Sequence, residues 1–263
     1  MNTVSSRDGT TIAYDKAGEG PALILVDGAL SVHSSGGKSE LAKLLAPHLT
    51  VYGYDRRGRG GSGDTLPYAV DREIEDIDAL IDHAGGSAFL YGHSSGGTLA
   101  IRAAVRLGGR VSKIAVYEPP HNDDPDAQEP WSTYLRELGE ALADGRRGDA
   151  VALFMRLVGT PGEQVDGMRQ ARFWPGMEAI APTLAYDHAA IIGERWSAPT
   201  DLAARVRVPA LAIAGDAGLP FMPRTARALS QAMPQGQLRI LKGQTHDVSP
   251  DVLAPVLVNF FTS

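Results

Sequence analysis

The chain has 263 residues, a formal net charge of −6 and no cysteine. This length suits one α/β domain with an insertion, and the scattered Lys and Arg residues argue against a nucleic-acid surface, which needs a concentrated basic patch. The absence of cysteine excludes thiolate catalysis, Cys-ligated zinc and disulfides.

The N-terminal segment predicts a small hairpin followed by a buried strand. Its first residues lack a basic start with an apolar core, and no apolar run in the chain approaches about 20 residues. We therefore expect neither a secretory signal nor a membrane span, and we place the protein in the cytoplasm. Residues 3–6 and 11–16 are typical of short strands joined at Asp8-Gly9. Residues 22–26 are continuously apolar, as in a parallel strand covered on both faces.

The next segment places a glycine-rich loop after a strand. An amphipathic helix ended by Pro47 precedes a strand at 50–54, and residues 55–62 read DRRGRGGS. Three arginines in such a loop are typical of a solvated or salt-bridged turn. The G-x-G-x-x-G pattern of residues 58–63 lacks the helix that a dinucleotide-binding fold opens within this loop, since the next helical pattern is at 71–83. We therefore expect no nucleotide cofactor.

Residues 88–97, AFLYGHSSGG, change from strand to helix across one sharp turn. Apolar, β-prone residues stop at Gly92, and apolar residues recur at helical spacing after Gly97. The glycines around Ser94 let neighbouring backbone pass close to a serine in strained φ/ψ space. The turn holds the hydroxyl at a helix N-terminus, where unpaired N–H groups favour developing negative charge. Ser94 is therefore a candidate nucleophile, and the Ser95 N–H is a candidate oxyanion donor.

This stretch resembles the nucleophile elbow of the α/β-hydrolase superfamily, and residues 55–62 resemble its D-x-R-G-x-G-x-S loop. The resemblance implies an α/β-hydrolase fold: a mostly parallel eight-stranded sheet flanked by helices, with a helical cap inserted after the sixth strand. It also implies a second oxyanion donor after the strand at 22–26, where Asp27-Gly28 replaces the usual His-Gly. By position that donor is the Ala29 N–H, with Gly28 beside it. A carboxylate at Asp27 is unhelpful there unless it points away or is paired.

After a strand at 113–117, the alternation of strand and helix stops. Helical patterns follow at 131–143, 149–158 and 178–192. We therefore expect a helical cap at 120–202 over the carboxyl edge of the sheet, and an α/β-hydrolase core at 1–119 and 203–263. Aromatic residues of the cap are candidates for a substrate pocket, although most of them can instead form the cap's own core. The candidate substrate-binding residues are Trp131, Phe154, Trp174 and, from the core, Phe221.

The C-terminal part predicts strands at 208–214 and 238–241, with a helix at 223–233 between them and a last helix at the end. Of the seven histidines, only His246 lies in the loop after the final strand, where the superfamily keeps its catalytic base. A serine hydroxyl is almost wholly un-ionised at neutral pH, so Ser94 needs a base to take its proton. An imidazole titrates in the suitable range.

The carboxylate that would orient this histidine has two candidates. In most relatives it lies three residues after the glycine that ends the strand at 208–214, a position that Gly218 occupies here. Asp216 lies in the same loop, two residues early. Glu118 directly follows the strand at 113–117, where some branches of the superfamily carry the acid. We favour Glu118 and retain Asp216 as the alternative.

Three local features resemble zearalenone-type lactone hydrolases: Asp27-Gly28, the elbow of residues 92–96, and Glu118-Pro119. This resemblance implies a serine hydrolase that cleaves a carboxylic ester or lactone of a small, largely apolar substrate. It would act through a Ser-His-acid triad and an acyl-enzyme, with no cofactor and no metal. The alternatives are a ligand-binding protein with slow or no turnover, and a cofactor-free perhydrolase or haloperoxidase-type enzyme. We expect a small-molecule partner, no nucleic acid and no membrane, and leave a homodimer open.

Overall fold

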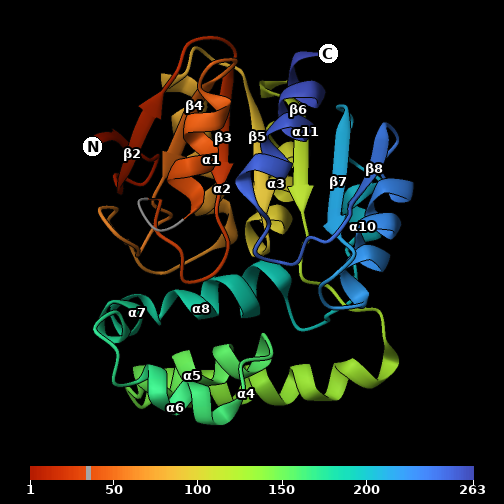
Figure 1. The fold of residues 1–263 in the computed structure, drawn as a ribbon. Coiled ribbons are helices and arrows are strands. Elements are labelled where there is room, and N and C mark those ends of the chain that lie inside the picture. Colours follow the sequence, from red (N-terminus) through yellow and green to blue (C-terminus); the bar gives the residue numbers. More distant parts are fainter. Residues whose placement is uncertain (34–36) are drawn as a thin grey trace.

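The computed structural model describes residues 1–33 and 37–263 and contains an eight-stranded sheet (Figure 1). The strands lie in the order β1-β2-β4-β3-β5-β6-β7-β8. Strand β2 pairs antiparallel with β1 and β4, and all other neighbours are parallel. The predicted mostly parallel, eight-stranded sheet is therefore confirmed. The strands are β1 (Asn2–Ser5), β2 (Thr11–Ala17), β3 (Ala22–Val26), β4 (Thr50–Tyr54), β5 (Ala88–His93), β6 (Val111–Tyr117), β7 (Ala210–Gly215) and β8 (Gly236–Leu241).

Helices cover both faces of this sheet, because its central strands carry apolar side chains on both sides. The core helices are α1 (Gly37–Leu45), α2 (Val70–His83), α3 (Ser95–Leu107), the short η1 (Gly108–Arg110), α10 (Phe221–Ala232) and α11 (Pro250–Thr262). On one face α2, α3 and α10 bury residues such as Ile77, Leu99 and Leu229. On the other face α1 and α11 bury residues such as Leu45 and Leu257.

Between β6 and β7 the chain forms helices that lie along one end of the sheet, and we call residues 120–202 the cap segment (Figure 1). Its elements are η2 (Pro125–Ala127), α4 (Gln128–Ala143), α5 (Arg147–Leu157), α6 (Gly162–Met168), α7 (Trp174–Ile180), α8 (Thr183–Ala185), η3 (Tyr186–Ile192) and α9 (Thr200–Ala203). They bury an apolar core of their own around Trp131, Leu138 and Val151. In the parts of the chain that the structure describes, no helix is long and apolar enough to cross a bilayer.

The helix predicted at 178–192 is not one continuous α-helix. It is divided into the end of α7, the short α8 and the π-helix η3. Pro182 precedes α8 and has no backbone N–H to donate, which interrupts the ladder at that point. The wider turn of η3 belongs to a class that is frequent at functional sites, and it buries the polar residues Asp187 and His188.

Candidate functional site

The turn between β5 and α3 holds Ser94 in a strained backbone conformation. Its φ is 55° and its ψ is −130°. Its N–H donates to the Tyr117 carbonyl at 2.9 Å, and its own carbonyl accepts from Gly97 N–H at 2.8 Å. A Cβ at Gly96 would lie 2.2 Å from the Val26 carbonyl oxygen, so only glycine lets α3 start this close to β3. The sequence folds here as a sharp elbow that presents one hydroxyl.

Three residues other than glycine have positive φ in the described ranges, and all three adjoin one cavity. They are Leu30 at 50°, Ser94 at 55° and Glu118 at 45°. Ser94 lines the cavity, Leu30 lies between two residues that line it, and Glu118 bonds to the lining residue His246. Such conformations persist only where the surrounding structure imposes them, and they cluster at functional sites.

His246 follows β8 and forms a hydrogen bond with the carboxylate that follows β6. Its Nδ1 lies 2.7 Å from Glu118 Oε2. The Glu118 side chain is fully buried, whereas that of His246 is 38% exposed. The second oxygen, Oε1, accepts the Gly215 N–H at 2.9 Å. Both carboxylate oxygens therefore act as acceptors, which favours the tautomer in which His246 Nδ1 carries the proton. The other ring nitrogen, Nε2, is then an acceptor.

Backbone contacts fix the loop that carries His246. Its carbonyl bonds to the His93 Nε2 at 3.0 Å, and the neighbouring Thr245 carbonyl accepts from the Tyr117 hydroxyl at 2.5 Å. Asp216, the alternative acid, is exposed, and its Oδ1 accepts the Gly243 N–H at 2.6 Å. The structure thus brings Glu118, and not Asp216, to the imidazole. The Asp216 side chain instead bonds to the turn after β8.

The loop after β3 lies directly against the serine. A Cβ at Gly28 would lie 2.8 Å from Ser94 Cβ, so a larger residue would collide with the Ser94 side chain at its Cβ and displace it. Ala29 lines the same cavity as Ser94, and Ser95 begins α3. Asp27 lines a different cavity and is not among the residues around Ser94. The structure therefore places Asp27 outside the cavity that Ser94 lines, where a carboxylate would be unhelpful.

A network of buried charged side chains holds the loop after β3 through its backbone carbonyls. Arg56 donates to Asp187 Oδ1 at 2.6 Å and to the Asp27 carbonyl at 3.1 Å. Arg59 donates to Asp187 Oδ2 at 2.5 Å and to the Gly28 carbonyl at 2.6 Å. Two guanidiniums therefore hold consecutive carbonyls of the loop, and one carboxylate of the cap segment holds both guanidiniums. This arrangement fixes the peptide planes that carry the Gly28 and Ala29 N–H groups.

The same network reaches the residue after the nucleophile. Ser95 Oγ donates to Asp187 Oδ1 at 2.7 Å. Burial alone would raise the pKa of Asp187, but Arg56 and Arg59 lower it to about 2, so the carboxylate stays ionised. Arg56 also forms a bidentate pair with Glu73, at 2.7 and 2.6 Å. Of the two expectations for this loop, the salt-bridged turn is correct and the solvated one is wrong. Its arginines are buried: Arg56, Arg57 and Arg59.

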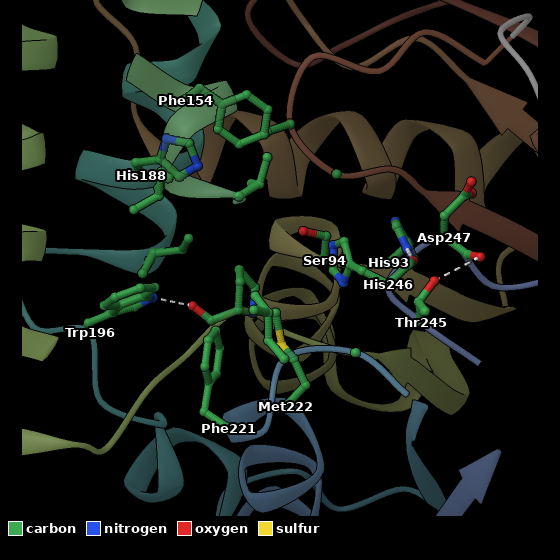
Figure 2. A pocket seen from close by; sticks show the side chains of 18 of the residues that line it. His93, Ser94, Phe154, His188, Trp196, Phe221, Met222, Thr245, His246 and Asp247 are labelled. Carbon is green, nitrogen blue, oxygen red and sulfur yellow. Dashed lines mark hydrogen bonds between the residues drawn. The ribbon is translucent and has the colours of Figure 1, made fainter. Parts of the chain in front are cut away.

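A cavity of about 430 Å³ separates the sheet from the cap segment. Figure 2 shows Ser94 and His246 on one side and Phe154, His188 and Trp196 on the other. Of the four predicted substrate-binding residues, three line this cavity: Trp131, Phe154 and Phe221. Trp174 does not. It is 3% exposed, packs in the core of the cap segment, and donates its Nε1–H to Glu178 at 3.0 Å. Its side chain is buried in the cap segment's own core and not at the cavity, so the prediction for Trp174 is wrong.

Two residues of this site, His188 and Asp187, are absent from the sequence-based candidates, whereas Trp196 is one of the cap aromatic residues that are candidates for the pocket. Trp196 and His188 line the cavity, and Asp187 holds the charge network behind it. The signal for the last two is an Asp-His pair inside the apolar stretch TLAYDHAAII, where charged and polar side chains need buried partners. Trp196 stacks on Trp131 with centroids 4.9 Å apart and meets Phe221 edge-on at 5.7 Å.

Among the residues that the structure describes, no group of His, Asp and Glu is arranged to hold a metal ion. The Gly-rich loop also offers no phosphate cradle. Its Gly61 N–H donates to Asp55 Oδ2 at 2.8 Å, and its Gly58 N–H donates to the Gly63 carbonyl at 2.9 Å. The groups that the structure brings together near Ser94 are its hydroxyl, the His246 imidazole and the buried Glu118 carboxylate.

In comparisons with known proteins, the chain is similar to hydrolases in sequence and in structure. The sequence profile described as the alpha/beta hydrolase family matches residues 30–256. The crystal structure of an alpha/beta hydrolase from Sphaerobacter thermophilus is 48% identical in sequence, covers 99% of this chain and 100% of its own, and superposes with a TM-score of 0.86. The pimeloyl-[acyl-carrier protein] methyl ester esterase of Nitrosospira multiformis is 27% identical over 90% of this chain and 91% of its own. The N-formylmaleamate deformylase of Pseudomonas putida is 33% identical, over only 52% of each chain.

Proposed function

The chain belongs to the alpha/beta hydrolase family, and we propose that it is a serine hydrolase that cleaves a carboxylic ester or a lactone. One observation carries the proposal: the Glu118–His246 pair, at 2.7 Å, reaches the cavity that Ser94 also lines. The curated relatives are named for hydrolysis of a methyl ester and of an N-formyl group, which supports hydrolytic chemistry in general. The apolar lining around Trp131 and Phe221 supports a small, largely apolar substrate.

In the proposed reaction, Ser94 Oγ attacks the carbonyl carbon while His246 Nε2 takes its proton. Glu118 keeps the proton on Nδ1 and stabilises the imidazolium that forms. The N–H groups of Ala29 and Ser95 receive the developing oxyanion, and the arginine network keeps the Ala29 peptide in place. Collapse of the tetrahedral intermediate breaks the ester bond, and the leaving oxygen takes the proton from His246.

The resulting acyl-enzyme is an ester of Ser94, and water completes the cycle. His246 removes a proton from the attacking water and returns it to Ser94 Oγ as the acid is released. With a lactone, the leaving hydroxyl remains attached to the acyl group, so ring opening gives a single hydroxy-acid product. The same five groups, namely the triad and the two N–H donors, therefore serve both substrates without a cofactor.

The test is the Ser94→Ala variant with p-nitrophenyl butyrate as substrate. We expect an unchanged circular dichroism spectrum and a loss of turnover of at least about 10³-fold, with a residual rate about 10³-fold above water from the oxyanion donors and binding. Ser31→Ala is the matched control, because it removes a different hydroxyl from the same cavity. It should lose far less activity. Equal turnover by Ser94→Ala and the wild type would refute the proposal.

The other outcomes separate the alternatives. Tight ligand binding without ester turnover would favour a binding protein on this fold. Faster peracid formation than hydrolysis, in acetate and peroxide, would favour a perhydrolase. The division into a core at 1–119 and 203–263 and a cap at 120–202, the cytoplasmic location, the absence of nucleic-acid and membrane partners, and a homodimer stay predictions from the sequence.

A further inference from the structure

The cavity contains a polar side chain that the proposed reaction does not use. His188, in the π-helix η3, lines the cavity but is only 3% exposed. Its ring packs on Phe154 with centroids 5.4 Å apart and meets the edge of Trp131 at 5.7 Å. Figure 2 shows it beside Phe154, across the cavity from Ser94 and His246. A polar group fixed among aromatic rings at this place can contact the distal part of a substrate.

The hydrogen bonds of His188 define where its proton lies. Burial lowers its pKa to about 4, so the imidazole is neutral at neutral pH. Its Nδ1 lies 2.7 Å from the hydroxyl of Tyr134, a buried residue that does not line the cavity. No other described residue accepts from this hydroxyl, and a buried O–H needs an acceptor, so Tyr134 donates to Nδ1. The proton of the neutral ring is therefore on Nε2, which is a donor.

The other residues that line the cavity determine whether it favours a charged or a neutral ligand. The lining is mostly apolar, with Leu157, Ile192 and Met222 among its members. None of the described lining residues is Lys or Arg, and the exposed Asp247, which also lines the cavity, adds a negative charge. A carboxylate placed here would lose its hydration without gaining a countercharge, which is unfavourable. A neutral oxygen loses much less hydration and gains a hydrogen bond.

We propose that the His188 Nε2–H is a specificity-determining donor that binds a neutral acceptor oxygen, such as a ketone, of the substrate beneath the cap segment. The favoured substrates are then neutral esters or lactones that carry a second oxygen away from the scissile carbonyl. Plain hydrocarbon esters and esters with a free carboxylate are both disfavoured. This inference rests on the proposed function, because it names the substrate class of the same site.

The test compares esters that differ in one group. The probes are p-nitrophenyl hexanoate, its 4-oxo and 5-oxo derivatives, and the mono-p-nitrophenyl ester of adipic acid. For the wild type we expect kcat/KM for the better oxo ester to exceed that for the hexanoate by about tenfold, the worth of one net hydrogen bond. The carboxylate ester should fall below the hexanoate by about 10²-fold.

The variant His188→Phe should reduce the oxo-to-plain ratio to about one, because it keeps the ring and removes the donor. His188→Gln keeps an N–H donor and should retain part of the ratio, which provides a readout if His188→Phe does not fold. A wild type that does not prefer either oxo ester, a ratio unchanged in His188→Phe, or fastest cleavage of the carboxylate ester would each overturn the inference.

A binding measurement separates this inference from the proposed function. Trp131 and Trp196 line the cavity, so tryptophan fluorescence reports occupancy without turnover. In the Ser94→Ala variant, methyl 5-oxohexanoate should bind about tenfold more tightly than methyl hexanoate. If no ester is hydrolysed by the wild type but this preference is seen, the proposed function fails and the role of His188 stands. If hydrolysis depends on Ser94 but the preference is absent, only the inference fails.

Discussion

Replacing Glu118 with Gln removes the negative charge that orients His246 and leaves the shape of the residue 118 side chain almost unaltered. The Gly215 N–H, 2.9 Å from Oε1, requires an oxygen at that position. The new amide oxygen takes this place, so the amide nitrogen faces His246 Nδ1 across the 2.7 Å contact. Two donors cannot share that contact, and Nδ1 must give up its proton. The proton then resides on Nε2, which can no longer accept one from Ser94.

The expected cost follows from this tautomer change. An enzyme held in the wrong histidine tautomer loses about 10⁴-fold in kcat, which corresponds to about 5.4 kcal/mol of transition-state stabilisation. Because Glu118 is buried and does not line the cavity, KM should change little. The retained bond to Gly215 should keep the variant folded, which thermal unfolding followed by circular dichroism checks.

The assay is continuous p-nitrophenol release by Glu118→Gln at saturating ester. Asp216→Asn is the matched control, since Asp216 loses the same charge while its contact is with Gly243. The control should stay within about threefold of the wild type, as expected for a surface change. The reasoning is refuted if Glu118→Gln retains more than about a tenth of kcat, or if Asp216→Asn loses as much activity as Glu118→Gln.

Three further predictions concern the groups around this pair. Asp187→Asn takes from buried Arg59 the carboxylate that it bonds to, while Arg56 keeps its pair with Glu73. The free energy of unfolding should therefore fall by about 3–5 kcal/mol and kcat should fall with it; an unchanged urea midpoint would contradict this. Gly28→Ala puts a Cβ 2.8 Å from Ser94 Cβ. Its kcat should drop by about 10²-fold in the ester assay, and wild-type turnover would argue against this contact. Burial lowers the pKa values of His121 and His188 to about 4, so the unfolded chain binds protons first as the pH falls. Stability should therefore decline between about pH 6.5 and 4, by up to about 3 kcal/mol for each histidine, and urea melts across that range should not be flat.

The strands and the elbow could be predicted because their signals are local. The continuous apolar run at 22–26 coincides with β3, and the strand predicted at 50–54 coincides with β4. The pattern around Ser94 specifies a strand, a turn and a helix within ten residues, and Gly96 is required by contacts of the same turn with β3. Such features depend on neighbouring residues and on sheet geometry, which the sequence displays directly.

The rest of the site depends on contacts between distant parts of the chain. Glu118 and His246 are 128 positions apart, and the positive φ of Glu118 that aims its side chain is not visible in a spacing rule. Arg56 and Asp187 are 131 positions apart. The only sequence signal for this pair is that Asp187 lies in an apolar stretch, which indicates a buried partner. For Trp174, an amphipathic pattern could not tell the face toward the cavity from the face toward the cap segment's own core.

The central claim is that the Ser94 oxygen attacks the substrate with His246 as its base. The most direct measurement is covalent labelling by a fluorophosphonate, followed by mass spectrometry of the intact protein and of its peptides. The account predicts one label per chain, located on Ser94, with labelling strongly slowed in His246→Ala. A wild-type protein that hydrolyses esters but takes no label, or takes it on another residue, would contradict the account.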